Sequence, residues 1–269
     1  MKKFIALALA AVLCLGALAG CGSQEDKVIK VGASITPHAE ILVAVRGEVE
    51  ELGYELEIVE YTDYVLPNES LNDGSLDANY FQHGPYLTTF NADHGYDLAN
   101  AAAIHYEPMG IYPGSKSSLD ELAEGDIIAI PNDGSNETRA LLILQELGYI
   151  TLAEGINASS NATILDIVDN PLNLDILEMA AENIPNSLPD VAFGIINGNY
   201  ALQAGLTGND ALASEDAESD AAQTYANIVA CRAGDEDSEK IQALITALTS
   251  ETCREFIEST YSGAVVPIF

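Results

Sequence analysis

The chain alternates between short apolar segments of strand character and longer segments with helical periodicity, and this alternation limits the folds that it can adopt. Residues 28–31 and 56–59 have the pattern of strands, and residues 41–45 between them suit a helix. A strand–helix–strand unit of this kind is typical of α/β proteins. Further candidate strands follow along the chain at residues 78–80, 101–105, 127–130, 174–177, 191–196 and 226–231.

Two lobes, each built on its own sheet, accommodate this number of units better than one sheet does. With 269 residues, of which 48% are hydrophobic, the chain can bury a substantial core. Two breaks mark candidate crossings between the lobes, the Pro- and Gly-punctuated residues 107–114 and the acidic residues 208–220. We therefore expect an α/β protein in which each lobe is a mostly parallel sheet flanked by helices. Residues 28–110 and 228–269 would form the first lobe, and residues 111–227 the second.

The net charge excludes several classes of partner. The chain has 42 Asp and Glu residues against 10 Lys and Arg residues, which gives a formal charge of -32 at pH 7. Such a surface repels phosphate backbones and anionic lipid headgroups. We therefore expect no nucleic-acid partner and no attachment to membranes through surface charge.

Residues 1–20 have the features of a secretory signal. Two lysines precede an apolar stretch over residues 4–17, which is too short to span a bilayer comfortably. Small residues lead up to Cys21 and polar residues follow it, which resembles a bacterial lipoprotein box. The resemblance implies cleavage before Cys21, a diacylglycerol thioether on its sulfur with a further acyl chain such as palmitate on the new amine, and a lipidated tether over residues 21–27. We expect a protein anchored to the extracytoplasmic face of a bacterial cell membrane.

Two cysteines remain in the body of the mature chain, Cys231 and Cys253, because Cys14 leaves with the signal and Cys21 takes the lipid. In an exported protein they can form a disulfide, and two buried free thiols fit the sequence equally well. The spacing does not decide between these alternatives, because a disulfide depends on the distance between the two Cα atoms.

The strongest candidate for ligand binding is the strand-to-helix turn at residues 130–139. Ligands of open α/β sheets lie beyond the carboxyl ends of the strands, so turns of this kind are natural sites. Asp133 and Ser135 are candidate N-caps of the helix, and Gly148 suits its C-terminal end. A helix N-terminus attracts an anion, and the guanidinium of Arg139, about one turn further, matches a carboxylate. A surface salt bridge is the alternative role for this arginine.

Two other turns carry polar or aromatic side chains. Asn197 follows an apolar strand and can offer both a donor and an acceptor, although a turn asparagine that bonds its own backbone has the same pattern. Residues 79–86 place Phe81, His83 and Tyr86 just after another strand. Such a cluster suits a small amphipathic ligand, although a histidine among aromatic residues is also common in protein cores.

Short matches to one family occur in a fixed order, at residues 31–42, 63–68, 77–87, 130–141, 196–201, 225–227 and 263–267. Together they resemble the NlpA/MetQ family, the methionine-binding lipoproteins of ABC importers. The likeness runs from about residue 28 to residue 269. Several matches in one order are far more specific than any single motif.

The resemblance implies a two-lobed periplasmic-binding-protein fold of type II. Such a protein closes on one free amino acid, usually methionine in the L or D form, and delivers it to an ABC permease driven by a cytoplasmic ATPase. It implies neither catalysis nor a cofactor or metal. Arg139 would hold the ligand carboxylate, and Asn197 and Asn227 would hydrogen-bond its polar end, the role of Asn227 resting on the resemblance alone. The walls of the side-chain pocket would be Tyr64, Phe81, His83 and Tyr86.

Other classes stay open on the residues alone. The chain has four histidines, at positions 38, 83, 94 and 105, which would suit a metal-binding transporter component, although no HExxH or paired-cysteine motif occurs. Ser117 and Ser135 are candidate nucleophiles of an enzyme, but the sequence has no GxSxG motif and no P-loop. A binding protein for another amino acid or a short peptide, and a structural surface protein, are further alternatives.

Overall fold

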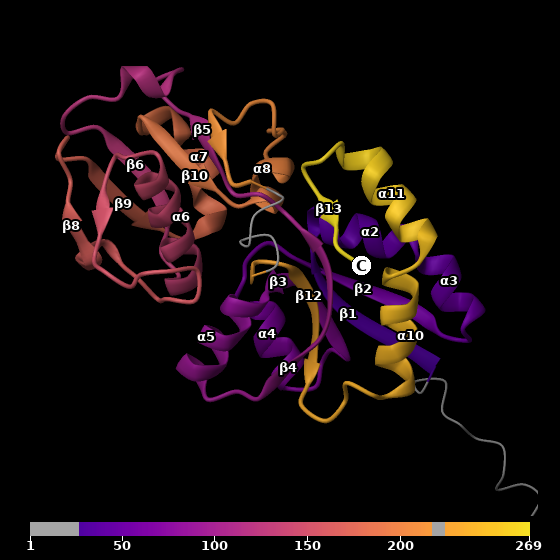
Figure 1. Cartoon of the computed structure of the whole chain (residues 1–269). Helices are drawn as coiled ribbons and strands as arrows, with labels where there is room; N and C mark the ends of the chain where they lie inside the picture. The colour runs from indigo at the N-terminus through magenta and orange to yellow at the C-terminus, as the bar shows by residue number, and fades with distance from the viewer. Residues whose placement is uncertain (1–26, 217–223) are drawn as a thin grey trace, which may run out of the picture.

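The computed structural model describes residues 27–216 and 224–269, which form two lobes with one main sheet each (Figure 1). The predicted two-lobed α/β fold is confirmed, and every strand expected from the sequence overlaps an observed strand. The signal, Cys21 and part of the acidic segment 208–220 lie outside the described residues. No helix within the described ranges is both long enough and apolar enough to cross a membrane.

The first lobe is built from segments on both sides of the second lobe in the sequence. Its strands are β1 (Val28–Ser34), β2 (Glu55–Tyr61), β3 (Ala78–His83), β4 (Leu98–Tyr106), β12 (Asn227–Arg232) and β13 (Val266–Pro267). Its helices are α2 (Glu40–Ala44), α3 (Arg46–Glu51), α4 (Leu66–Asn72), α5 (Gly84–His94), α10 (Glu239–Leu248) and α11 (Glu251–Tyr261). The sheet has the order β13-β4-β12-β3-β1-β2.

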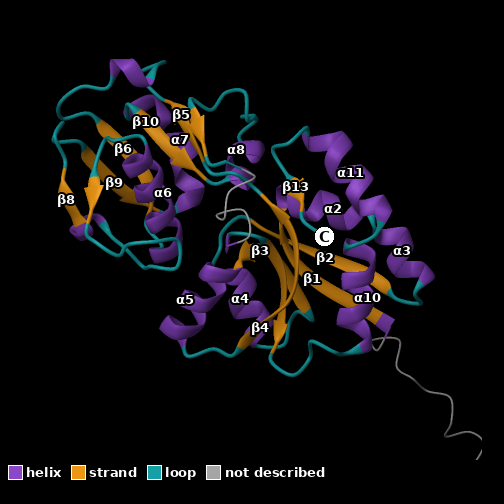
Figure 2. Ribbon diagram, in the orientation of Figure 1, coloured by secondary structure: helices purple, strands orange, loops and turns teal. Residues whose placement is uncertain are grey.

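Helices cover both faces of this first sheet (Figure 2). On one face, α2, α3, α10 and α11 bury their apolar stripes against β1 and β3, as Leu42, Val49, Leu244 and Ile257 show with no exposed surface. On the other face, α4 and α5 pack in a smaller cluster with β4 and β12. Strand β3 lies between these layers of helices. The turn after its carboxyl end, with His83 and Tyr86, faces the second lobe.

The second lobe has the strand order β11-β5-β10-β6-β9. Its strands are β5 (Gly110–Pro113), β6 (Ile127–Pro131), β9 (Asp175–Met179), β10 (Phe193–Ile196) and β11 (Ala213–Ser214), with a separate ribbon of β7 (Thr151–Leu152) and β8 (Ile167–Asp169). Its helices are α6 (Gly134–Glu146), α7 (Ile184–Ser187) and α8 (Gly198–Gln203). Short 3-10 turns lie at Leu119–Glu121, Ile164–Asp166, Ala181–Asn183 and Leu188–Asp190.

Both sheets are mixed, so the expectation of mostly parallel sheets is wrong in this detail. The strands of the strand–helix–strand units are parallel, as in the pairs β1–β2, β1–β3, β6–β9 and β6–β10. The strands next to the crossings are antiparallel, because β12 returns against β3 and β4, and β5 runs against β10 and β11. The lobe boundaries differ from the expected ones by one residue at each crossing. Gly110, expected in the first lobe, begins β5 of the second, and Asn227, expected in the second lobe, begins β12 of the first.

The helix α6 begins as the sequence predicts. The Asp133 carboxylate accepts a hydrogen bond from the backbone N–H of Asn136 at 3.0 Å, which makes Asp133 the N-cap, while the Ser135 hydroxyl donates to the same carboxylate. Gly148 has a φ of +78°, which a glycine adopts without strain after a helix end. The anion that the helix N-terminus attracts is therefore the protein's own Asp133, so this end of the helix is already occupied.

The two cysteines of the described body are free thiols. Cys231 and Cys253 are both buried, and neither forms a disulfide. Burial raises the pKa of Cys231 to about 11 and that of Cys253 to about 12, which keeps both protonated near neutral pH.

A buried carboxyl group in α6 makes the stability depend on pH. Glu137 is 2% exposed, and burial, with Glu178 nearby, raises its pKa from 4.5 to about 7. The folded state therefore holds a proton that the unfolded chain has released, so the free energy of unfolding falls as the pH rises from 4.5 to about 7. Glu137→Gln keeps an oxygen to accept the hydrogen bond from the Ile164 N–H.

We expect Glu137→Gln to raise the Tm by at least about 2 °C at pH 8, and to have little effect at pH 4.5, in thermal unfolding followed by circular dichroism. Glu154→Gln, at an exposed loop position, is the matched control and should change the Tm at neither pH. A lower Tm for Glu137→Gln at pH 8 would contradict the assignment.

Candidate ligand-binding site between the lobes

One pocket lies between the lobes and draws residues from both of them and from the first crossing. Its lining consists of Tyr64, Phe81, Gln82, His83, Tyr86, Glu107, Asn136, Arg139, Asn197, Gly198, Asn199 and Asn227. All seven residues singled out from the sequence are among them, although they come from segments far apart in the chain. Their roles toward a ligand stay predictions.

Aromatic rings form one wall of the pocket. The ring of Tyr64 lies 5.8 Å from that of Phe81 and 5.7 Å from that of Tyr86, with centroids at the usual spacing of packed rings. The Tyr86 hydroxyl donates to the backbone oxygen of Tyr64 at 2.9 Å, which holds the two segments together. From the second lobe, Tyr200 closes the group at 4.8 Å from Tyr64. This wall offers flat apolar surface to a ligand side chain.

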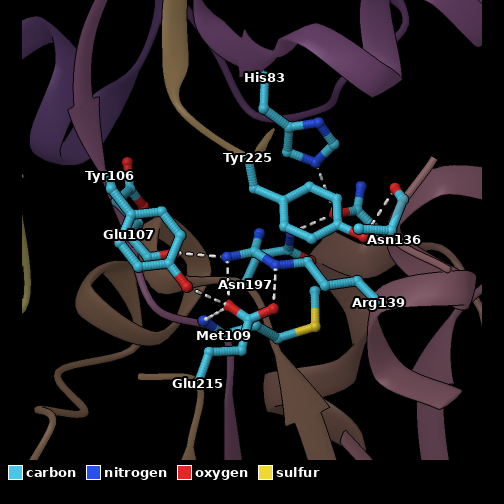
Figure 3. A network of polar contacts seen from close by, with 10 residues as sticks. His83, Tyr106, Glu107, Met109, Asn136, Arg139, Asn197, Glu215 and Tyr225 are labelled. Carbon is cyan, nitrogen blue, oxygen red and sulfur yellow. Dashed lines mark hydrogen bonds and ion pairs between the residues drawn. The ribbon is translucent and has the colours of Figure 1, made fainter. Parts of the chain in front are cut away.

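Arg139 projects from α6 into the polar side of the pocket and is only 3% exposed (Figure 3). Its Nε donates to Oε1 of Glu215 at 2.6 Å, and its Nη2 donates to Oε2 at 2.5 Å. Nη2 also donates to the backbone oxygen of Glu107 at 2.6 Å. The guanidinium carbon lies 4.6 Å from the centre of the Tyr225 ring. The alternative of a surface salt bridge is therefore wrong, because Arg139 is buried and the side chain of Glu215 is only 8% exposed.

Glu215 joins Arg139 to the crossings between the lobes. Its Oε2 accepts hydrogen bonds from the Tyr106 hydroxyl at 2.7 Å and from the Met109 N–H at 2.8 Å (Figure 3). Tyr106 and Met109 flank the first crossing, and Glu215 stands at the start of the second. The Nε and Nη2 donors of Arg139 are thus taken by the protein itself.

A chain of amide hydrogen bonds fixes how several side chains are oriented. His83 Nδ1 accepts from the Tyr86 N–H, so its Nε2 is the donor to Asn136 Oδ1 at 3.0 Å. The same oxygen accepts from Asn197 Nδ2 at 2.8 Å, while Asn136 Nδ2 donates to Asp133. Burial and the charge of Arg139 lower the pKa of His83 to about 4, so this histidine is neutral. The first lobe thus reaches the second through a hydrogen bond from a neutral histidine.

Two amide atoms at the start of α8 are buried without a hydrogen-bond partner among the described residues, Oδ1 of Asn197 and Nδ2 of Asn199. The remaining amide atom of each side chain is used, because Asn199 Oδ1 accepts from the Tyr64 hydroxyl at 2.5 Å. A buried polar atom without a partner costs about 1–3 kcal/mol. One acceptor, Asn197 Oδ1, and one donor, Asn199 Nδ2, are therefore available to hydrogen-bond a polar ligand.

Glu107 lies at the first crossing, between two histidines of the first lobe. Its Oε1 is 2.7 Å from His105 Nε2 and 3.4 Å from His38 Nε2, and His38 Nε2 is 2.9 Å from Asn227 Oδ1. Burial lowers the pKa of His38 to about 4 and of His105 to about 3, so both rings are neutral. A Cβ at Gly198 would lie 2.7 Å from the Cβ of Glu107, so only glycine admits this approach.

Comparison with known proteins places the whole body of the chain in one family. Residues 29–269 match the family model described as NlpA lipoprotein. The chain belongs to the NlpA lipoprotein family. This agrees with the resemblance found in the sequence, and the match covers both lobes and every residue of the pocket.

Relatives within the NlpA lipoprotein family are similar over their full length. The methionine-binding lipoprotein MetQ of Bacillus subtilis is 40% identical over 278 residues, which cover 100% of this chain and 99% of the relative. The structure of a nutrient-binding protein from Burkholderia cenocepacia bound to methionine is 41% identical, with a TM-score of 0.85 over 90% of this chain and 100% of that one. A lipoprotein structure from Ruminococcus gnavus is 52% identical, with a TM-score of 0.89 at the same coverage.

Several lining residues were not proposed from the sequence: Gln82, Glu107, Asn136, Gly198 and Asn199. Three of them, Asn136, Gly198 and Asn199, stand in turns that the sequence had marked, and Gln82 stands between two predicted residues. Glu107 carries no such signal, because a single acid at a crossing resembles any surface carboxylate in a chain with 42 acidic residues.

The group most like a metal site is formed by His38, His105 and Glu107, whose ligand atoms lie within 4.8 Å of one another. Their hydrogen bonds explain this cluster, because His105 Nε2 meets Glu107 and His105 Nδ1 meets the Tyr80 hydroxyl. A metal-bound histidine normally anchors its second nitrogen. Nδ1 of His38 has no hydrogen-bond partner among the described residues, so the cluster fits a metal poorly.

The ion pair of Arg139 predicts a large effect on stability. In Arg139→Ala, Glu215 keeps a buried charge without its counter-charge, which costs about 3–5 kcal/mol. We expect the Tm to fall by roughly 10 °C, and Arg139→Met combined with Glu215→Gln to recover at least half of the loss. Lys30→Ala, which breaks an exposed ion pair with Glu57, is the control and should change the Tm little. An Arg139→Ala protein as stable as the wild type would show that the pair contributes nothing.

Proposed function

We propose that this chain is the lipid-anchored substrate-binding protein of an ABC importer. It captures a free amino acid, methionine in the L or D form, between its lobes and delivers it to the permease, which a cytoplasmic ATPase drives. The chain itself catalyses no reaction and needs no cofactor. The methionine-bound relative from Burkholderia cenocepacia and the MetQ relatives support this assignment.

The observation that carries the proposal is the arrangement of unsatisfied polar atoms opposite an aromatic wall. Asn199 Nδ2 is a donor suited to the carboxylate of an amino acid, with Arg139 also in the lining, and Asn197 Oδ1 is an acceptor suited to its ammonium group. Tyr64, Phe81 and Tyr86 offer the apolar faces that a thioether favours, worth about 0.3–1.5 kcal/mol. Both ends of one small zwitterion therefore find complementary groups.

Closure of the lobes and binding of the ligand share one free energy. The two lobes meet through the Tyr64–Asn199 and His83–Asn136 hydrogen bonds and through Tyr200, whose hydroxyl donates to the Thr62 oxygen at 3.3 Å. A ligand stabilises this closed arrangement only by contacts that the open form lacks. The ligand proposed here contacts both lobes and therefore favours the closed conformation. A permease that binds the closed conformation can in this way distinguish the loaded protein from the empty one.

We expect the delipidated protein, unfolded and refolded to remove carried ligand, to show a large thermal shift with L- or D-methionine in a screen of all amino acids. Asn197→Ala should weaken methionine binding by about 10- to 100-fold in calorimetry, because the acceptor for a charged group is lost. Asn72→Ala, at an exposed position at the end of α4, is the matched control.

Other outcomes of the same screen identify the alternatives. A shift with a different amino acid or a short peptide would move the side-chain assignment and leave the binding role in place. A shift with zinc alone would favour a metal-binding component. The absence of any small-molecule shift would favour a structural surface protein and end the proposal.

The anchoring step has its own test. We propose that Cys21 becomes the acylated N-terminus after cleavage, with residues 21–27 as the tether. Expression of the full chain in a bacterium should give a membrane-bound protein, whose N-terminal peptide carries the mass of the acyl chains. Cys21→Ser should leave the protein uncleaved or released from the membrane. An unmodified Cys21 in the wild-type protein would contradict the proposal.

A further inference from the structure

A turn of the second lobe, residues 157–161, contacts the first lobe outside the ligand pocket. The Thr89 hydroxyl of α5 donates a hydrogen bond to Oδ1 of Asn161 at 3.0 Å. The two residues are 72 positions apart in the sequence and belong to opposite lobes, and neither is among the residues that line the pocket. Helix α5 lies next to α6 where the two lobes approach each other (Figure 1). The contact therefore joins the lobes at a place where it does not meet the ligand.

Hydrogen bonds fix the chain that follows this turn to α6. Thr138 Oγ1, which is fully buried, accepts from the Ala162 N–H at 2.7 Å and donates to the backbone oxygen of Gly134 at 2.7 Å. The Ile164 N–H donates to Oε1 of Glu137 at 2.8 Å. The turn is thus attached to the second lobe, and we expect it to move with that lobe as one body.

The turn also holds its own shape. The Asn157 N–H donates to Ser160 Oγ at 3.0 Å, and the Ser160 N–H donates to the backbone oxygen of Asn157 at 2.9 Å. A Cβ at Gly134 would lie 3.3 Å from Asn161 Oδ1, so this amide packs against the first residue of α6. The second lobe therefore places the acceptor, and Thr89 reaches it only when the first lobe is close.

A bond of this kind stabilises the closed form whichever ligand is bound. It is present when the lobes meet and is lost when they separate, and only such differential contacts shift a conformational equilibrium. Thr89 is half-buried and Asn161 is exposed, so water competes for both groups. A neutral hydrogen bond that exchanges with water makes a modest net contribution. The effect on ligand binding should therefore be small but measurable.

We propose that the Thr89–Asn161 hydrogen bond is a latch, which holds the lobes closed over a bound ligand and slows its release. The inference rests on the proposed function, because a latch matters only if the lobes close on a ligand. Thr89 and Asn161 are positioning residues, since they act on the ligand through the lobes. Loss of the latch should raise the rate of release and leave the rate of association nearly unchanged, because the bond forms after the ligand has entered.

Release is measured on the refolded chain loaded with radiolabelled methionine and chased with excess unlabelled methionine. In Thr89→Val, which replaces the hydroxyl by a methyl group, release should be about 3- to 10-fold faster. The association rate, obtained from this rate and the calorimetric Kd, should change by less than about 2-fold. Asn161→Ala should have the same effect from the other lobe. The two substitutions together should be no more than about 2-fold faster than either alone, because both remove one bond.

Two variants of α5 are the matched controls. Thr89→Ser keeps the hydroxyl, and Thr88→Val removes the neighbouring hydroxyl, which donates to the Gly84 oxygen of the same helix at 3.1 Å. Both should release methionine within about 2-fold of the wild type. A Thr89→Val protein that releases methionine no faster than Thr88→Val overturns the inference. So does a Thr89→Ser protein as fast as Thr89→Val, or a double variant in which the two effects multiply in full.

Failure of the latch and failure of the proposed function give different results. If no amino acid binds the wild type, the proposed function fails and the latch fails with it. If methionine binds and Thr89→Val leaves its release unchanged, the proposed function stands and only the latch is lost. Asn161→Ala tests the same bond from the second lobe, so a Thr89→Val variant that does not fold still leaves a decisive measurement.

Discussion

The buried ion pair between Arg139 and Glu215 is the interaction on which the cleft depends. Glu215 receives two hydrogen bonds from Arg139 of α6 and two more from Tyr106 and Met109 at the first crossing. One carboxylate therefore ties the second lobe to both connections between the lobes. The removal of either charge leaves the other buried and unpaired, which is far more costly than the loss of an exposed pair. Arg139 is consequently held in place before any ligand arrives.

The rest of the pocket divides its chemistry between the lobes. The first lobe supplies the aromatic rings, the neutral His83 and the amides of Gln82 and Asn227, and the second supplies three further amides and Arg139. Asn136 orients Asn197 within the second lobe and Tyr64 of the first lobe orients Asn199, so that each amide keeps one polar atom without a partner among the described residues. These atoms lose their hydrogen bonds to water when the lobes meet, which costs free energy. A ligand that hydrogen-bonds to them offsets this cost. Binding and closure are thus coupled through the same few atoms.

Much of the site could be predicted from the sequence, because its residues stand in turns between strong strand and helix patterns. The N-cap at Asp133 and the convergence of the aromatic turn with Arg139 follow from the rule that ligands lie at the carboxyl ends of strands. Glu107 and Glu215 could not be predicted, since each is one acid among 42 and their partners lie far away in the sequence. The mixed sheets also escaped prediction, because strand direction depends on how the chain returns from the other lobe.

The sequence by itself determined the α/β class, the two lobes, the helix boundaries in α6 and which turns carry the polar and aromatic side chains, because periodicity and capping are local properties of the chain. Only the tertiary structure decided which charges pair. It assigned the bidentate face of Arg139 to Glu215, kept three histidines neutral by burial, and placed Glu107 against two of them, His38 and His105. The physical reason is that ion pairing and desolvation depend on distances and burial between segments remote in sequence, which no local pattern encodes.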